Sequence, residues 1–260
     1  MRSRSPLLLV GTIAVIALGA LGIAGLLGRS NPAPVSPVAS SAASPAASPA
    51  ASPGESADGG AATTEPASPP ASAADGSVDG AWRVDPSLGS ADDWSASFVG
   101  YRVKEELASV GAIEAVGRTT AVDGSLEVAG STVTAASFTA DLSTLRSDEP
   151  RRDGQMGTQG LETDTYPTGT FVLTSPIELG SVPAVGSSVV ADATGDLTLH
   201  GVTRSVTIPL TATRAADEIE VTGSLVIRWG DFGMAKPRSF VVISLADELK
   251  IELRLRFTRG

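Results

Sequence analysis

The 260-residue sequence contains no cysteine and a single histidine, His200. The lack of cysteine excludes a disulfide framework, a thiolate nucleophile, a cysteine-ligated metal centre and a lipid-modified cysteine. One histidine excludes histidine-cluster metal sites and leaves little basis for a Ser-His-Asp triad. The sequence also lacks GxSxG, HExxH and glycine-rich phosphate-binding motifs. We therefore predict no catalytic residues, no metal site and no cofactor.

Basic residues are also scarce, because 19 Lys and Arg face 29 Asp and Glu, a formal net charge of −10. This sign repels phosphate backbones and disfavours nucleic-acid binding. The acidic pairs Asp92-Asp93, Asp148-Glu149 and Asp217-Glu218 are interpreted as solvated loops.

The remaining residue types are unevenly distributed along the chain. Its six Phe, three Trp and two Tyr all lie between Trp82 and Phe257. Residues 30–80 contain no Leu, Ile, Met or aromatic residue, whereas Leu7 to Leu27 is apolar apart from Thr12. We therefore predict three parts, which are residues 1–29, 30–80 and 81–260.

Residues 1–29 have the features of a membrane anchor. The apolar run from Leu7 to Leu27 would span roughly 31 Å as a helix, close to the thickness of a bilayer core. Arg2 and Arg4 precede it and should stay cytoplasmic. We predict a single-pass protein of the cytoplasmic membrane with its C-terminal domain outside the cytoplasm. The alternative is a signal peptide cleaved near Gly22-Ile23-Ala24, which would give a secreted protein.

Residues 30–80 are rich in Pro, Ala and Ser, with near-repeats such as residues 43–49. Such a segment has little apolar surface to bury, so it cannot offset the entropy of ordering its backbone. We predict a disordered linker. It would act as a spacer beyond the membrane, or it is a tolerated low-complexity insertion.

From Trp82 onward the dominant hydrophobic period is two. Ile251, Leu253, Leu255 and Phe257 alternate with charged residues, which is typical of a strand with one buried and one wet face. Further β-rich runs cover residues 94–103, 112–120, 125–128, 132–141, 168–178, 189–199 and 219–229. Ser147–Leu161 is the one helix-like interruption, with Ser147 or Asp148 as its cap and Pro150 in its first turn.

The pattern predicts an all-β fold of eight or nine antiparallel strands with one short helix. Such a chain closes into a single barrel or packs as a sandwich. A transmembrane β-barrel would present its apolar face outward and carry aromatic girdles, which this sequence lacks. A soluble eight-stranded barrel has room for core side chains or for one small ligand.

Four stretches of the sequence carry a family resemblance in their order and spacing. They are Trp82-Arg83-Val84-Asp85-Pro86; Arg152-Asp153 with Met156, Leu161, Tyr166-Pro167 and Phe171; residues 195–204, which read GDLTLHGVTR; and Asp231-Phe232-Gly233-Met234. Residues 82–257 thereby resemble the YceI-like family of exported polyisoprenoid-binding β-barrel proteins.

The resemblance implies a lipocalin-like barrel of eight antiparallel strands, with a helix near one mouth and a long apolar tunnel. It also implies that an isoprenoid or another long-chain amphiphilic lipid binds inside the barrel. The sequence departs from the family in its N-terminal anchor and linker. It also departs at Val99-Gly100-Tyr101, where the family often has a histidine.

The candidate ligand-binding residues are apolar residues on strands or bends and one charged pair. The apolar candidates are Phe98, Phe138, Phe171 and Leu225, expected to face inward, and Trp229 and Phe232 at a bend. Arg152 and Asp153 would meet a lipid head group at the mouth, or would instead form an intramolecular ion pair that fixes the helix. We interpret His200 as a hairpin residue.

Three functions follow from these features. The first is a lipid-binding module that holds an isoprenoid or similar amphiphile outside the cytoplasm. The alternative is a filled β-barrel scaffold that acts as a cell-surface interaction module, and an enzyme acting on the cell envelope has the least support. A cavity lined by small residues favours lipid binding, whereas one plugged by Phe and Trp favours the scaffold. A homodimer is compatible with the sequence, which does not fix the oligomeric state.

Overall fold

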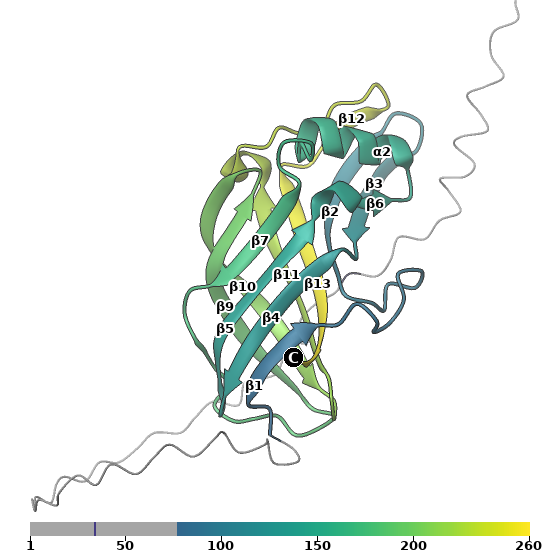
Figure 1. Cartoon of the computed structure of the whole chain (residues 1–260). Helices are drawn as coiled ribbons and strands as arrows, with labels where there is room; N and C mark the ends of the chain where they lie inside the picture. Colours follow the sequence, from purple (N-terminus) through teal and green to yellow (C-terminus); the bar gives the residue numbers. More distant parts are fainter. Residues whose placement is uncertain (1–33, 35–76) are drawn as a thin grey trace, which may run out of the picture.

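The computed structural model describes residue 34 and residues 77–260 (Figure 1). The anchor predicted for residues 1–29 lies outside the described residues, as does nearly all of the linker predicted for residues 30–80. Both therefore stay predictions. Within the described part of the chain, no helix combines the length and the apolar character needed to cross a membrane.

The described residues form one antiparallel sheet with a few short helical segments. The strands are β1 (Gly80–Val84), β2 (Phe98–Leu107), β3 (Gly111–Thr119), β4 (Val122–Ala129), β5 (Thr132–Asp141), β6 (Arg146–Ser147), β7 (Thr168–Leu173), β8 (Ile177–Glu178), β9 (Ser188–Leu199), β10 (Val202–Arg214), β11 (Ile219–Arg228), β12 (Val242–Leu245) and β13 (Glu248–Arg259). The helical segments are η1 (Leu142–Thr144), α2 (Pro150–Gln155), η2 (Met156–Gly160) and η3 (Trp229–Phe232).

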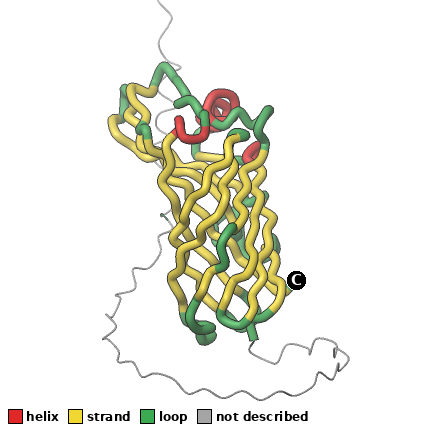
Figure 2. The backbone as a smooth tube through the Cα atoms, turned by 90° about the vertical axis from the view of Figure 1, so that its left-hand side faces the viewer, coloured by secondary structure: helices red, strands yellow, loops and turns green. Residues whose placement is uncertain are grey.

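The sheet closes into a barrel because β13 pairs with strands on both of its sides. It pairs with β11 on one side, and on the other with β2 through Lys250–Arg254 and with β1 through Phe257–Arg259. Around the barrel, β1 and β2 thus occupy one strand position between them. Strands β3 and β4, which follow each other in the chain, occupy the next position. The eight positions are β1/β2, β3/β4, β5, β7, β9, β10, β11 and β13. The predicted eight-stranded antiparallel barrel is confirmed, and Figure 2 shows it from the side with the helical segments at one end.

The short helix is confirmed, but its predicted cap is wrong. Helix α2 begins at Pro150 and its N-cap is Glu149, whose carboxylate accepts a hydrogen bond from the Arg151 amide at 3.1 Å. The predicted caps are engaged elsewhere, because Ser147 donates to a residue inside the helix and Asp148 forms an ion pair there. Ser147 and Asp148 thus contact side chains in the first turn of α2 instead of capping its backbone.

The inner face of β13 has the predicted apolar pattern. Leu253, Leu255 and Phe257 are all buried. The prediction that the opposite face is wet is wrong, because Glu252 is 0% exposed. Its carboxylate lies 2.6 Å from Arg102 Nε on β2 and 3.0 Å from Arg118 Nη2 on β3. The outer face therefore holds a buried ion cluster that joins three adjacent strands.

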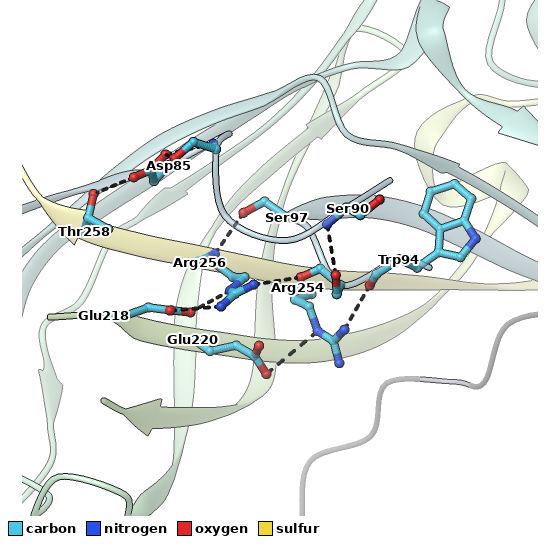
Figure 3. A network of polar contacts seen from close by, with 11 residues as sticks. Asp85, Ser90, Trp94, Ser97, Glu218, Glu220, Arg254, Arg256 and Thr258 are labelled. Carbon is cyan, nitrogen blue, oxygen red and sulfur yellow. Dashed lines mark hydrogen bonds and ion pairs between the residues drawn. The ribbon is translucent and has the colours of Figure 1, made fainter. Parts of the chain in front are cut away.

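Residues 85–97, here called the covering segment, pack over this outer face (Figure 3). Arg254 Nη1 donates to the carbonyl oxygen of Trp94 at 2.9 Å, and the Arg256 amide donates to Ser97 Oγ at 2.9 Å. The guanidinium of Arg118 lies 4.1 Å from the centroid of the Phe98 ring. The strand predicted from residue 94 therefore starts later, at Phe98, because residues 94–97 belong to the covering segment.

Removing the charge of Glu252 should destabilise the barrel strongly. Glu252→Gln leaves two buried guanidinium groups without their shared carboxylate, and we expect a loss of about 3–5 kcal/mol in the free energy of unfolding. Urea denaturation of the full chain measures it. The control is Glu248→Gln on the same strand, where the side chain is 60% exposed and 3.6 Å from Arg228, and where about 1 kcal/mol or less is expected. Equal losses in the two variants would contradict the role given to the buried cluster.

Candidate functional site

The interior of the barrel holds a principal cavity of about 120 Å³. Its wall comes from the inward positions of β4, β5, β7, β9, β10, β11 and β13, and Leu179 and Pro183 of the loop before β9 also line it. The lining is apolar apart from a few polar residues. It includes Val78, Ser125, Leu126, Val133, Ala136, Ser137, Phe138, Phe171, Leu173, Pro183, Ala191, Ala193, Ile208, Leu210, Ala212, Arg214, Val221, Leu253, Leu255 and Phe257.

Small side chains keep this cavity open. Alanine occupies inward positions on three strands, at residues 136, 191, 193 and 212. A Leu or Phe at such positions would fill the space, since interiors are otherwise close-packed. None of the three tryptophans lines the principal cavity, but Phe138, Phe171 and Phe257 do. The lining therefore combines small side chains, which favour a ligand, with phenylalanines, which favour a filled scaffold.

Phe138 and Phe171 form a stacked pair in the wall of the principal cavity, and Phe138 also lines the second cavity. Their ring centroids lie 5.5 Å apart with an interplanar angle of 20°. Glycines in the wall make room for the rings, because a Cβ on Gly195 would lie 2.5 Å from Phe171 Cζ and one on Gly124 would lie 2.9 Å from Phe138 Cβ.

Two further cavities continue the row toward the helical end. The second cavity, of about 30 Å³, shares Phe138, Ile208 and Leu253 with the principal cavity. The third, here called the mouth cavity, measures about 230 Å³ and shares Leu142 with the second. It lies between Tyr101 on β2 and the α2–η2 segment. The cavity at the helical end thus has a more polar lining than the two cavities inside the barrel.

The whole barrel matches a known family. Residues 82–257 match the model of the YceI-like domain. This chain belongs to the YceI-like family. The predicted resemblance is therefore confirmed over the described globular part, whereas the predicted boundaries of the three parts stay predictions.

Solved structures of the YceI-like type are similar to this chain. A polyisoprenoid-binding domain from Saccharophagus degradans, implicated in plant cell wall breakdown, is 20% identical to this chain, with a TM-score of 0.54. The match covers 70% of this chain and 100% of that domain's chain. Burkholderia cenocepacia BcnA is 21% identical, with a TM-score of 0.47 and coverages of 61% and 95%. A Campylobacter jejuni YceI protein is 16% identical, with a TM-score of 0.46 and coverages of 55% and 84%. No curated protein matches the chain. The first likeness shows the shared fold.

Three of the predicted apolar site residues line the cavities of this YceI-like domain. Phe138 and Phe171 line the principal cavity, and Leu225 lines the second. The expected inward orientation of Phe98 is wrong. Its neighbour Val99 lines the second cavity, and side chains alternate along a strand, so Phe98 lies on the outer face beneath Arg118.

Trp229 and Phe232 are buried in η3 and line none of the three cavities, although Trp229 borders a separate, more open pocket with Asp231. Trp229 donates from Nε1 to the carbonyl oxygen of Ala246 at 3.0 Å, and Phe232 is 1% exposed. Neither residue is among those that line the three cavities. They pack the helical end of the barrel, and their contact with a ligand stays a prediction.

Arg152 and Asp153 hold the helix of the YceI-like domain in place. Arg152 Nη2 lies 2.8 Å from Glu105 Oε1 on β2, and its Nη1 forms an ion pair with Asp148. Asp153 Oδ1 accepts hydrogen bonds from the amide and the hydroxyl of Ser147, at 2.9 and 2.6 Å. Arg152 and Asp153 do not form an ion pair with each other, as the alternative interpretation expected. Each is instead held by contacts to other residues of the chain. Asp153 also lines the mouth cavity.

His200 is confirmed as a hairpin residue between β9 and β10. Its φ is 50°, and its Nε2 lies 2.9 Å from Glu162 Oε2. The hairpin therefore contacts the segment that follows η2. Among the described residues, no group of three or more His, Cys, Asp or Glu could hold a metal ion.

Sequence reasoning did not identify Tyr101 as a site residue. It is 5% exposed on the inner face of β2, and within the part of the chain that the structure describes its hydroxyl has no hydrogen-bond partner. Its ring lies against Gly117 of β3, where a Cβ would come within 2.4 Å of Tyr101 Cε1. The only signal in the sequence is that a tyrosine stands close to where the family often has a histidine. The register that places Gly117 beside it is visible only in the structure.

The fit of the wall around Phe171 can be tested with one methyl group. Gly195→Ala places a Cβ 2.4 Å from the Val172 carbonyl oxygen and 2.5 Å from Phe171 Cζ, so we expect a loss of about 1–3 kcal/mol in the free energy of unfolding. The control is Gly154→Ala in α2, where nothing lies within 4 Å and helix propensity favours alanine by up to about 1 kcal/mol. Urea denaturation measures both variants. A neutral Gly195→Ala variant would show that the ring does not rest against the wall.

Proposed function

We propose that this protein is a membrane-anchored, extracytoplasmic lipid-binding protein that holds an isoprenoid or similar amphiphile inside its barrel. The observation that carries the proposal is the pair of apolar cavities inside the barrel, the principal and the second, which share Phe138, Ile208 and Leu253. Burial of an apolar chain there would contribute about 25 cal/mol per Å² of buried surface. The YceI-like fold supports the same function.

A long chain would occupy both the principal and the second cavity. It would then have to pass the side chains that the two cavities share, which are Phe138, Ile208 and Leu253. The Phe138 ring is stacked on Phe171 by dispersion and quadrupole contacts worth about 0.5–1.5 kcal/mol. The two cavities measure about 120 and 30 Å³, and a cavity of about 150 Å³ holds one molecule the size of benzene. A chain of several isoprene units would therefore require Phe138 and its neighbours to move apart.

The anchor and the localisation belong to the same proposal. Their support is the apolar run from Leu7 to Leu27 preceded by Arg2 and Arg4. Residues 30–80 would separate the lipid-binding domain from the membrane surface. The homodimer stays a prediction.

A filled scaffold that serves as an interaction module is the second candidate function. The observation in its favour is the small volume of the second cavity, about 30 Å³, beside the stacked phenylalanines. The two functions differ in whether the interior must stay open. A substitution that fills the interior distinguishes them.

Filling the principal cavity should weaken lipid binding. Ala191 lines this cavity, whereas Val190 beside it is 42% exposed on the outer face. We expect Ala191→Phe to weaken binding of a long-chain polyprenol at least tenfold, about 1.4 kcal/mol, because the ring occupies the space of the chain. Val190→Phe should bind within twofold of the unsubstituted chain. Titration of the full chain, followed by native mass spectrometry, measures both.

Thermal unfolding of the two variants controls for folding. If Ala191→Phe stays folded and binds the polyprenol as well as Val190→Phe does, the ligand lies outside the cavity and the proposal is wrong. Absence of polyprenol binding by the unsubstituted chain would favour the scaffold.

A further inference from the structure

The loop between β8 and β9, residues 179–187, contains no charged side chain. Val182 and Val185 on this loop are 37% and 58% exposed. Single exposed valines are common on protein surfaces, but here the whole loop also lacks a charge. It can therefore leave water for an apolar medium without the desolvation cost of an ionised group.

The β8–β9 loop also borders the principal cavity, since Leu179 and Pro183 line it. The Pro183 carbonyl oxygen accepts a hydrogen bond from Arg214 Nη1 on β10 at 2.9 Å. This bond holds the middle of the loop through a side chain rather than through strand pairing. A molecule that enters the cavity here displaces Pro183 without breaking a strand pair.

The loop lies at the end of the barrel opposite the helical segments (Figure 2). The 12 residues of β9 separate the loop, which ends before Ser188, from the β9–β10 hairpin, which follows Leu199. His200 in that hairpin contacts Glu162, which follows η2. The helical segments therefore lie beyond the far end of β9.

The chain enters the barrel at the same end as the β8–β9 loop. The Asp79 carboxylate, just before β1, accepts a hydrogen bond from the Gly130 amide, and the carbonyl oxygen of Ser131 accepts one from the Leu179 amide. The apolar run from Leu7 to Leu27 precedes this point in the sequence. An anchor formed by that run, as proposed above, is thus joined to the end of the barrel that carries the loop.

The charged residues that border the loop do not form a cationic surface. Carboxylates at this end come from Asp79, Glu178 and Asp217, against the guanidinium groups of Arg214 and Arg259. Anionic lipids attract clusters of basic residues, and this end of the barrel has none. Apolar contact therefore has to supply the affinity for a membrane, which favours a bilayer without net charge.

A second group of exposed apolar residues lies at the opposite end and serves as a comparison. Phe240, Val241 and Ile243 are 110%, 58% and 64% exposed. Their loop is held at the helical end, because the Arg238 amide donates to Gln159 of η2. None of the three lines the principal or the second cavity. The β8–β9 loop differs from this group in combining exposed valines with a cavity wall.

We propose that the β8–β9 loop docks the barrel on a bilayer without net charge and forms the entrance through which a lipid passes from that bilayer into the principal cavity. The inference rests on the proposed function and adds to it the membrane contact and the route of the ligand. Because one loop both meets the bilayer and lines the cavity, the lipid enters without crossing water.

The docking is tested with single cysteines, since the chain has none of its own. Val185→Cys and Val241→Cys place a polarity-sensitive fluorophore at two positions that are both 58% exposed. The labelled full chain is reconstituted into phosphatidylcholine vesicles that contain a nitroxide-labelled phospholipid. The fluorophore at residue 185 should be quenched at least threefold more than the one at residue 241, and added phosphatidylserine should not increase its quenching. Equal quenching at the two positions, or quenching that requires phosphatidylserine, would overturn the proposal.

The entrance is tested by adding a charge to the loop. Val185→Asp should slow the transfer of a long-chain polyprenol from phosphatidylcholine vesicles to the full chain about tenfold, because the carboxylate resists entry into the bilayer. The control is Val226→Asp on the outer face of β11, where the valine is 55% exposed and transfer should stay within twofold of the unsubstituted chain. Thermal unfolding shows that both variants are folded.

The outcomes separate the two proposals. If polyprenol is transferred to Val185→Asp as fast as to Val226→Asp, the lipid enters elsewhere and the inference is wrong, whereas lipid binding stands. If residue 185 is quenched but the unsubstituted chain takes up no polyprenol from vesicles or from detergent micelles, the proposed function is wrong and the entrance with it.

Discussion

The ion cluster around Glu252 is the contact on which the barrel wall depends. Its carboxylate is completely buried between Arg102 and Arg118, and it joins β13, β2 and β3 where the neighbour of β13 changes from β1 to β2. Buried charges are tolerated only when they are paired. The pairing therefore fixes which strands meet at the join, and the covering segment shields the cluster from solvent.

Because the charged side chains on the outer face of β13 pair with residues of neighbouring strands, the inner face of β13 can be entirely apolar. Leu253 and Leu255 lie on the face of β13 opposite to Glu252 and line the principal cavity. The alanines opposite them leave space that larger side chains would fill, at a cost in packing stability. A protein that keeps such a space gives up stability for it, which indicates a function for the interior rather than for the surface.

The period-two pattern was sufficient to predict antiparallel strands that form a barrel or a sandwich, and the buried face of β13. The family motifs were needed to choose the barrel and to predict the domain. Contacts between distant segments could not be predicted in this way. The outer face of β13 is contacted by the covering segment, some 160 residues earlier, at Arg254 and Arg256. The orientation of Phe98 depended on register, since a shift of one residue moves a side chain to the other face. Whether an inward residue lines a cavity or fills the core depends on the volumes of its neighbours across the barrel, which no local pattern records.

We propose that the barrel holds a lipid in the cell that makes the protein. The most direct test is native mass spectrometry of the full chain purified from its own cells, without added lipid. The account predicts a protein that carries one bound molecule of isoprenoid-like mass, released when the barrel is denatured. A ligand-free mass for the folded protein would contradict it.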